Sequence, residues 1–185
     1  GMSDFDYALL GLALANDKRW PEADRCTVEL ERRGVPYMAD YLWELTQTAT
    51  TQGFDEISDV RLLALEKLDK KHPGYIVGLA RLLTRNNQGA QAQAALDNYI
   101  NDPTNSEKDL SQVRLELYTM LRQQGDSAGC DRLAKSALNG PITNLLGYVQ
   151  LVDYIDLSTA LIDVPMDTSG RVEAPDEPLE SFEIQ

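Results

Sequence analysis

The chain has 185 residues, 43% of them hydrophobic, and a formal net charge of −13. This size and hydrophobic content are enough for one domain with its own core, or for a short repeat array. The excess of acids argues against nucleic-acid binding, because phosphates are bound by lysine and arginine. The negative charge either serves solubility alone or attracts a basic partner.

The first residues bear on where the protein is expected to reside. Gly1 precedes Met2, and we interpret it as a remnant of an expression tag, with Met2 as the native start. Residues 3–16 carry acids where a signal peptide has a basic segment, and the apolar runs are far shorter than a membrane helix. We therefore expect a cytoplasmic protein with no membrane partner.

Apolar residues recur three and four positions apart along most of the chain, which is typical of amphipathic helices. Prolines fall between these periodic segments, as expected of a ring that interrupts helical hydrogen bonding. Gly34 after two arginines marks a helix end, and Ser106 with Asp109 resembles a capping box. In chain order, the predicted helices are 4–16, 21–33, 37–52, 55–71, 74–87, 89–101, 107–124, 126–139 and 142–162.

The predicted helices fall into four pairs with similar spacing. Apolar positions align when the pairs start near Asp4, Ala39, Ile76 and Ser111, which are 35, 37 and 35 residues apart. Self-similarity at this period predicts an α-solenoid of helical hairpins. Small residues should lie where paired helices cross, and we expect Gly11 to face Ala23 across the first pair. The list of crossing residues is Gly11, Ala23, Ala95, Cys130 and Ala134.

Residues 4–139 resemble the tetratricopeptide repeat family. The first unit matches through Tyr7, Leu10, Gly11, Leu14, Ala23 and Leu30, and the fourth through Leu117, Tyr118, Leu121, Cys130, Ala134 and Ala137. The resemblance implies an all-α, right-handed superhelix of about four hairpins. A helix at 142–162 would cap the last hairpin, so the domain would span 1–162 and an acidic, extended tail 163–185. Repeat lengths depart from the family, and a related helical-hairpin array is the alternative.

The resemblance also implies which side chains line a concave, protein-binding groove. Carried over by position, they are Ala8, Leu12, Asn16, Trp43, Gln47, Thr50, Ala80, Thr84, Asn87, Leu115, Thr119, Arg122 and Gln123. Amide side chains in this set suit the backbone of an extended peptide, and Trp43 would anchor a side chain or else belong to the core. The family's chaperone-tail binders hold a terminal carboxylate with basic and amide residues. Of those positions, here Ala8, Leu12, Glu44, Val77 and Arg81, only Arg81 fits.

No arrangement of residues predicts catalysis, a cofactor or a metal site. The sole histidine, His72, lies in "KKHPGY" and reads as an exposed turn residue without a nucleophile spaced to use it. Cys26 and Cys130 have no metal-binding or disulfide spacing and are predicted to be buried. We read Asp55, Glu56 and Asp59 as helix-start acids.

The last residues of the chain differ in composition from the predicted helices. Val164–Gln185 has six acids, three prolines and one arginine, a composition typical of disorder, and Leu179, Phe182 and Ile184 are its expected anchors. The main hypothesis is a non-enzymatic adaptor or chaperone-like module that binds a protein or peptide, with a basic segment as the candidate partner. The alternatives are a self-assembling protein, a homodimer formed through its tail, and an enzyme on a helical scaffold.

Overall fold

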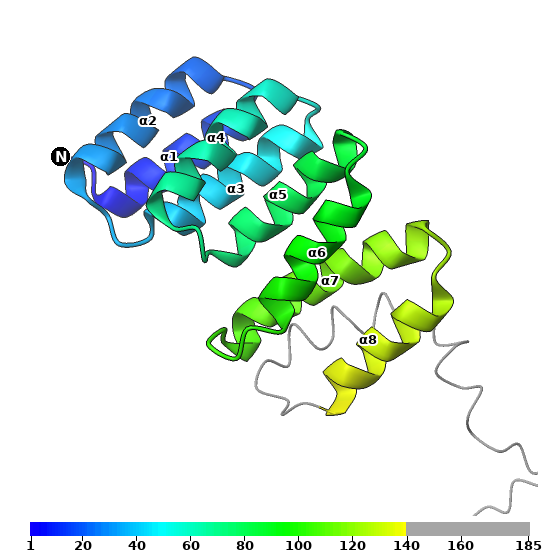
Figure 1. Cartoon of the computed structure of the whole chain (residues 1–185). Coiled ribbons are helices and arrows are strands. Elements are labelled where there is room, and N and C mark those ends of the chain that lie inside the picture. Colours follow the sequence, from blue (N-terminus) through cyan, green and yellow to red (C-terminus); the bar gives the residue numbers. More distant parts are fainter. Residues whose placement is uncertain (140–185) are drawn as a thin grey trace, which may run out of the picture.

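The structure is a computed structural model that describes residues 1–139, which form eight α-helices (Figure 1). The helices are α1 (Asp4–Asn16), α2 (Trp20–Arg33), α3 (Met38–Thr51), α4 (Asp55–Leu68), α5 (Pro73–Arg85), α6 (Gly89–Ile100), α7 (Glu107–Gln123) and α8 (Ser127–Asn139). No strand occurs in this part of the chain, so the prediction of an all-α fold is confirmed for it. The predicted helix at 142–162 and the tail from 163 lie outside the described residues.

Local signals in the sequence explain where several helices begin and end. Ser3 and Asp6 form a reciprocal capping box at the start of α1, in which each side chain accepts from the other residue's backbone N–H. Ser106 accepts from the Asp109 N–H at the start of α7, as predicted, although the Asp109 carboxylate accepts from the Ser106 hydroxyl instead of its backbone. Gly34 ends α2 with a φ of 64°, a left-handed conformation that favours glycine.

The helices pack as four consecutive pairs, α1 with α2, α3 with α4, α5 with α6 and α7 with α8, which confirms the predicted hairpins. The first helices of successive pairs also contact one another, α1 with α3, α3 with α5 and α5 with α7. The pairs therefore follow each other in chain order, with their first helices adjacent (Figure 1).

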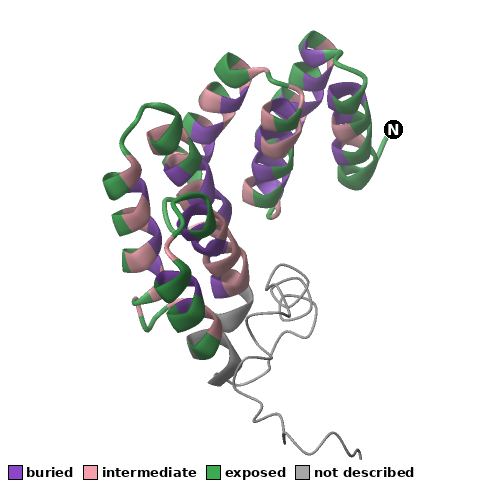
Figure 2. Cartoon of the chain, turned by 90° about the vertical axis from the view of Figure 1, so that its right-hand side faces the viewer, coloured by how far each residue is buried: buried purple, intermediate pink, exposed green. Residues whose placement is uncertain are grey.

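A hydrophobic core runs through all four pairs, and buried residues occupy the helix sides that face other helices (Figure 2). One hairpin is too small to bury its own apolar face, so stacking of neighbours is needed to form a continuous core. The largest fully buried side chains come from six of the helices and are Leu30, Leu42, Leu45, Leu65, Val77, Leu96 and Val113. Cys26 and Cys130 are buried, as predicted.

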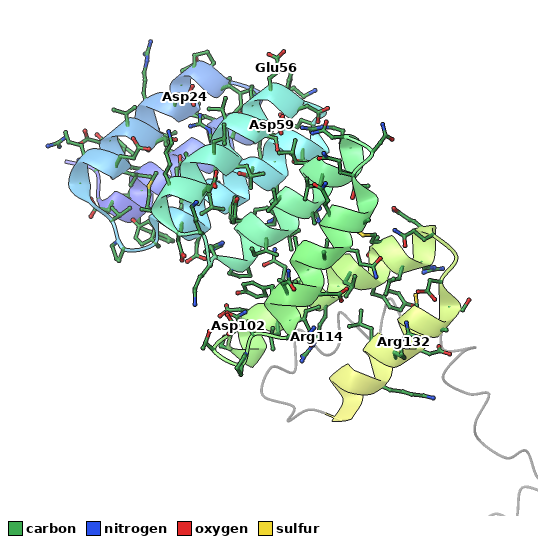
Figure 3. All side chains as sticks on the ribbon, viewed as in Figure 1. Asp24, Glu56, Asp59, Asp102, Arg114 and Arg132 are labelled. Atoms are coloured by element: carbon green, nitrogen blue, oxygen red, sulfur yellow. The ribbon has the colours of Figure 1, made fainter. Side chains whose placement is uncertain are left out.

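Polar contacts fix neighbouring pairs relative to each other. The Gln52 amide donates to the carbonyl oxygens of Ala15 and Asn16 at 3.0 and 3.1 Å, which joins the end of α3 to the end of α1. Arg85 of α5 donates to both carboxylate oxygens of Asp59 at 2.6 Å. Figure 3 shows Asp59 on α4. These bonds connect first helices to one another and one pair to the next.

Gly11 allows α1 to approach two other helices closely. A Cβ atom at this position would overlap the Tyr41 hydroxyl of α3 and lie 3.1 Å from the Cys26 Cβ of α2. The sequence placed Gly11 at a helix crossing correctly. Its nearest neighbours are nevertheless Cys26 and Tyr41, and not Ala23, because α1 packs against both α2 and α3.

Gly11→Ala is expected to lower the free energy of unfolding by about 1–3 kcal/mol, because the added methyl group overpacks this contact. Gly89→Ala is the matched control, since the nearest atom to a Cβ there is 4.0 Å away and alanine favours a helix. Urea unfolding of both variants would measure the difference. Equal stability of the two variants would contradict the close approach of α1 to Tyr41.

Candidate functional site

A hollow with a volume of about 930 Å³ opens between the first helices of the last three pairs. Its walls come from α3, α5 and α7 and from the loops that precede α5 and α7. The lining includes Asp40, Trp43, Glu44, Gln47, Asp69, Lys71, His72, Val77, Arg81, Tyr99, Asn105, Asp109, Gln112, Leu115 and Glu116.

The lining of this hollow is acidic. Five of the lining residues are carboxylates, and two, Lys71 and Arg81, are permanent cations. Arg81 is neutralised by Glu116, to whose two carboxylate oxygens it donates at 3.0 and 2.7 Å. Glu44 is exposed, and no lysine or arginine in the described part of the chain forms an ion pair with it. The hollow therefore presents net negative charge to an occupant.

Trp43 forms the floor of the hollow beneath Arg81. Its side chain is buried, with 5% exposed, and Gly74 of α5 packs so closely on the ring that a Cβ there would overlap it. The Arg81 guanidinium carbon lies 5.9 Å from the ring centroid, a cation–π geometry. The sequence left two roles for Trp43, a peptide anchor or a core residue, and this degree of burial fits the core residue. Trp43 also contributes to the lining of the hollow.

His72 connects two pairs at one wall of the hollow. Its Nδ1 accepts a hydrogen bond from the Gly74 N–H at 3.1 Å and so caps α5. Because Nδ1 is the acceptor, the ring proton sits on Nε2, which donates to Asp40 Oδ1 of α3 at 3.1 Å. The side chain is 11% exposed. His72 lies between two helices, as predicted, but the prediction of an exposed side chain is wrong, because both ring nitrogens are engaged.

Tyr99 closes the hollow from α6. Its hydroxyl donates to the Lys71 carbonyl oxygen at 3.1 Å and thereby holds the loop that leads to α5. Burial, followed by the nearby charges of Asp109, Asp69 and Asp102, raises the pKa of Tyr99 to about 12.

The raised pKa of Tyr99 predicts a loss of stability at high pH. Below pH 10 the phenol is neutral in both states, so the contribution of Tyr99 is complete. Between pH 10 and about 12 the unfolded chain releases this proton while the folded chain retains it, and unfolding becomes easier. Urea unfolding at several pH values should show a steeper decline for the native protein than for Tyr99→Phe. Parallel declines would contradict the burial of this phenol.

The predicted groove residues divide into three groups. Trp43, Gln47 and Leu115 line the large hollow. Two smaller hollows of about 300 and 380 Å³ at the other end of α7 are lined by Thr84, Thr119, Arg122 and Gln123. The remaining positions line none of these hollows: Ala8 and Ala80 are buried, Leu12 and Thr50 are half-buried, and Asn16 and Asn87 are exposed.

The acidic residues of the hollow were not among the predicted groove residues. Asp40, Glu44, Asp109 and Glu116 all lie in its lining. The repeat offset contained a usable signal, because Glu44, Arg81 and Glu116 are 37 and 35 residues apart and occupy equivalent places on α3, α5 and α7. The Arg81–Glu116 bond shows that two members of this row meet across neighbouring helices.

Other chemistry finds little support in the described residues. Within residues 1–139, no group of three or more His, Cys, Asp or Glu side chains is placed to hold a metal ion. Burial raises the pKa of both thiols, Cys26 and Cys130, which keeps them protonated and unreactive. Asp55 and Asp59 form ion pairs with Arg85. No helix in this part of the chain combines the length and apolar character needed to cross a membrane.

No protein-family model, curated protein or solved structure matches the chain.

Proposed function

We propose that this chain is a non-enzymatic protein-interaction module, an adaptor or chaperone-like scaffold, that binds an extended segment of another protein between α3, α5 and α7. The observation that carries the proposal is the hollow of about 930 Å³ with more carboxylates than cations in its lining. A groove can bind an extended peptide with side-chain amides that hydrogen-bond to the peptide backbone and with carboxylates that attract its positive charges. Gln47, Asn105 and Gln112 provide such amides in the lining.

The charge of the lining favours a basic occupant. Within residues 1–139 no lysine or arginine forms an ion pair with Glu44 or Asp40, so both carboxylates can receive a lysine or arginine of the partner. Complementary charge raises association rates and excludes wrong partners. The same argument disfavours the chain's own tail as occupant, since Val164–Gln185 has six acids and one arginine.

The proposal includes a right-handed superhelix that resembles tetratricopeptide repeats and a cytoplasmic setting. The first is supported by four consecutive hairpins with adjacent first helices and by repeat offsets of 35, 37 and 35 residues. The second is supported by two cysteines that are buried and unpaired, a usage typical of reducing compartments.

A charge-reversal pair tests the proposed site. A fluorescein-labelled nonapeptide of alternating lysine and alanine should bind the native chain, and its glutamate–alanine counterpart should not. Glu44→Lys is expected to weaken the lysine peptide at least about ten-fold, because it places a like charge in the hollow. Glu31→Lys is the matched control, since Glu31 is exposed on α2 and lies outside the lining.

Fluorescence anisotropy at two salt concentrations would measure these affinities, and binding should weaken as salt screens the charges. Equal losses for Glu44→Lys and Glu31→Lys would mean that the peptide senses only the net charge of the chain, and the site would then be wrong.

A further inference from the structure

The outer side of α1 exposes an apolar surface. Phe5 is 65% exposed and Leu9 51%, and Met2 and Leu10 are each 41% exposed. The opposite side of the same helix is also apolar and buries Ala8, Gly11, Leu14 and Ala15 in the core. A helix that is apolar on both sides is expected to be covered on both, so this outer surface is suited to a partner.

The repeat offset relates this surface to the acidic hollow. Phe5 and Leu9 lie 35 residues before Asp40 and Glu44, which is the offset between the first two pairs. Burial supports the equivalence, because Ala8 on α1 and Trp43 on α3, which are also 35 residues apart, are both buried. By this offset Phe5 and Leu9 correspond on α1 to Asp40 and Glu44 on α3, and α1 packs directly against α3.

We infer that the occupant of the groove is a two-part segment, with one large apolar side chain on Phe5 and Leu9 and a lysine or arginine facing Asp40 and Glu44. This inference rests on the proposed function and specifies its ligand. Neighbouring helix axes are about 8–10 Å apart, and an extended chain advances about 3.3 Å per residue. The apolar residue and the basic residue should therefore be about three positions apart.

The α1 end and the α3 end of this surface differ in chemistry, and this difference favours one orientation of the bound segment. The α1 end offers aliphatic and aromatic side chains with no carboxylate between Phe5 and Leu9 except Asp6, whose oxygen accepts from Ser3. The α3 end offers the exposed carboxylates of Asp40 and Glu44. A segment with its apolar residue on the α3 side would place that residue against carboxylates, so one orientation is favoured.

Three labelled nonapeptides test the inference against the native chain. The first has a phenylalanine three positions before a lysine pair, the second has serine in place of phenylalanine, and the third has glutamates in place of the lysines. The first should bind about ten-fold tighter than the second, because it buries one large apolar side chain. The third should bind weakest.

A double substitution of equal size provides the control. Phe5→Ser with Leu9→Ser should abolish the preference for the first peptide over the second and leave the affinity for the second unchanged. Val60→Ser with Leu63→Ser removes similarly exposed apolar side chains, 61% and 55% exposed on α4, and should retain the preference. All four changed residues are exposed, and melting curves would verify that both variants are folded.

The outcomes separate this inference from the proposed function. Equal binding of the first and second peptides to the native chain, with loss on Glu44→Lys, would overturn the inference and leave the proposed function standing. Binding of none of the peptides would overturn both. Sedimentation velocity gives a third outcome: a dimer that Phe5→Ser with Leu9→Ser dissociates, together with no peptide preference, would assign the α1 surface to a second copy and overturn the inference.

Discussion

Trp43→Ala is expected to lower the free energy of unfolding by about 3–5 kcal/mol, the usual cost of deleting a large buried aromatic side chain. The indole is 5% exposed and is held between α3 and α5, where Gly74 packs on its face and Arg81 lies above it. Removal of the ring leaves a cavity between the second and third pairs. Urea unfolding followed by far-ultraviolet circular dichroism would measure the loss.

Trp43→Phe is the control for this substitution. It retains an aromatic ring against Gly74 and should therefore cost markedly less than alanine. A loss below about 1 kcal/mol for Trp43→Ala would show that the ring is not a packing element, since core truncations of this size cost several times more. The affinity of folded Trp43→Ala for the lysine peptide then shows whether Trp43 also binds the peptide or serves only in packing.

Leu96→Ala is expected to separate two unfolding transitions that coincide in the native protein. Leu96 is fully buried in α6, in the third pair, and its truncation should cost about 2–5 kcal/mol. Trp43 contacts Gly74 and Arg81 of the third pair. The measurement is therefore made in the Trp43→Phe background, where Trp20 of the first pair is the remaining tryptophan. In an array whose units contact only their neighbours, a weakened third pair unfolds before the first two. Circular dichroism should then change at lower urea than tryptophan fluorescence.

Leu45→Ala supplies the comparison, because Leu45 is equally buried but lies in α3, beside Trp43 in the sequence. This variant should shift the fluorescence transition as far as the circular dichroism transition. If both probes remain coincident in Leu96→Ala, the four pairs unfold as one cooperative unit, and the proposed array of separable repeats is wrong.

The helices were predictable because each carries local information. Apolar spacing, the Ser106 cap and the glycine at 34 are all readable within one turn of the chain, and the structure confirms them. The errors in the predicted helices concern the residues at which they begin and end. The fourth helix stops at Leu68 and not at 71, because Asp69 adopts an extended conformation and its carboxylate accepts from the Lys71 N–H. The fifth begins at Pro73, whose fixed φ suits the first turn.

The site was less predictable because its neighbours are distant in sequence. Asp40 lies 32 residues from His72 and Arg81 lies 35 from Glu116, and no local pattern indicates that either pair meets. The predicted lining used positions about one residue along each helix from the row that contains Glu44 and Arg81. A shift of one position rotates the lining by about 100°, which is why Ala8 and Ala80 were included although they are buried.

A chain with a single histidine has one pair of imidazole proton resonances, and His72 places them in the wall of the hollow. Its two nitrogens are engaged by Gly74 and Asp40, so a cation that competes for the Asp40 carboxylate alters the shielding of the ring. A one-dimensional proton spectrum, without isotope labels or assignment of the rest of the chain, would therefore report occupancy of the groove. The same resonances would reveal slow or fast exchange of the ligand during a titration.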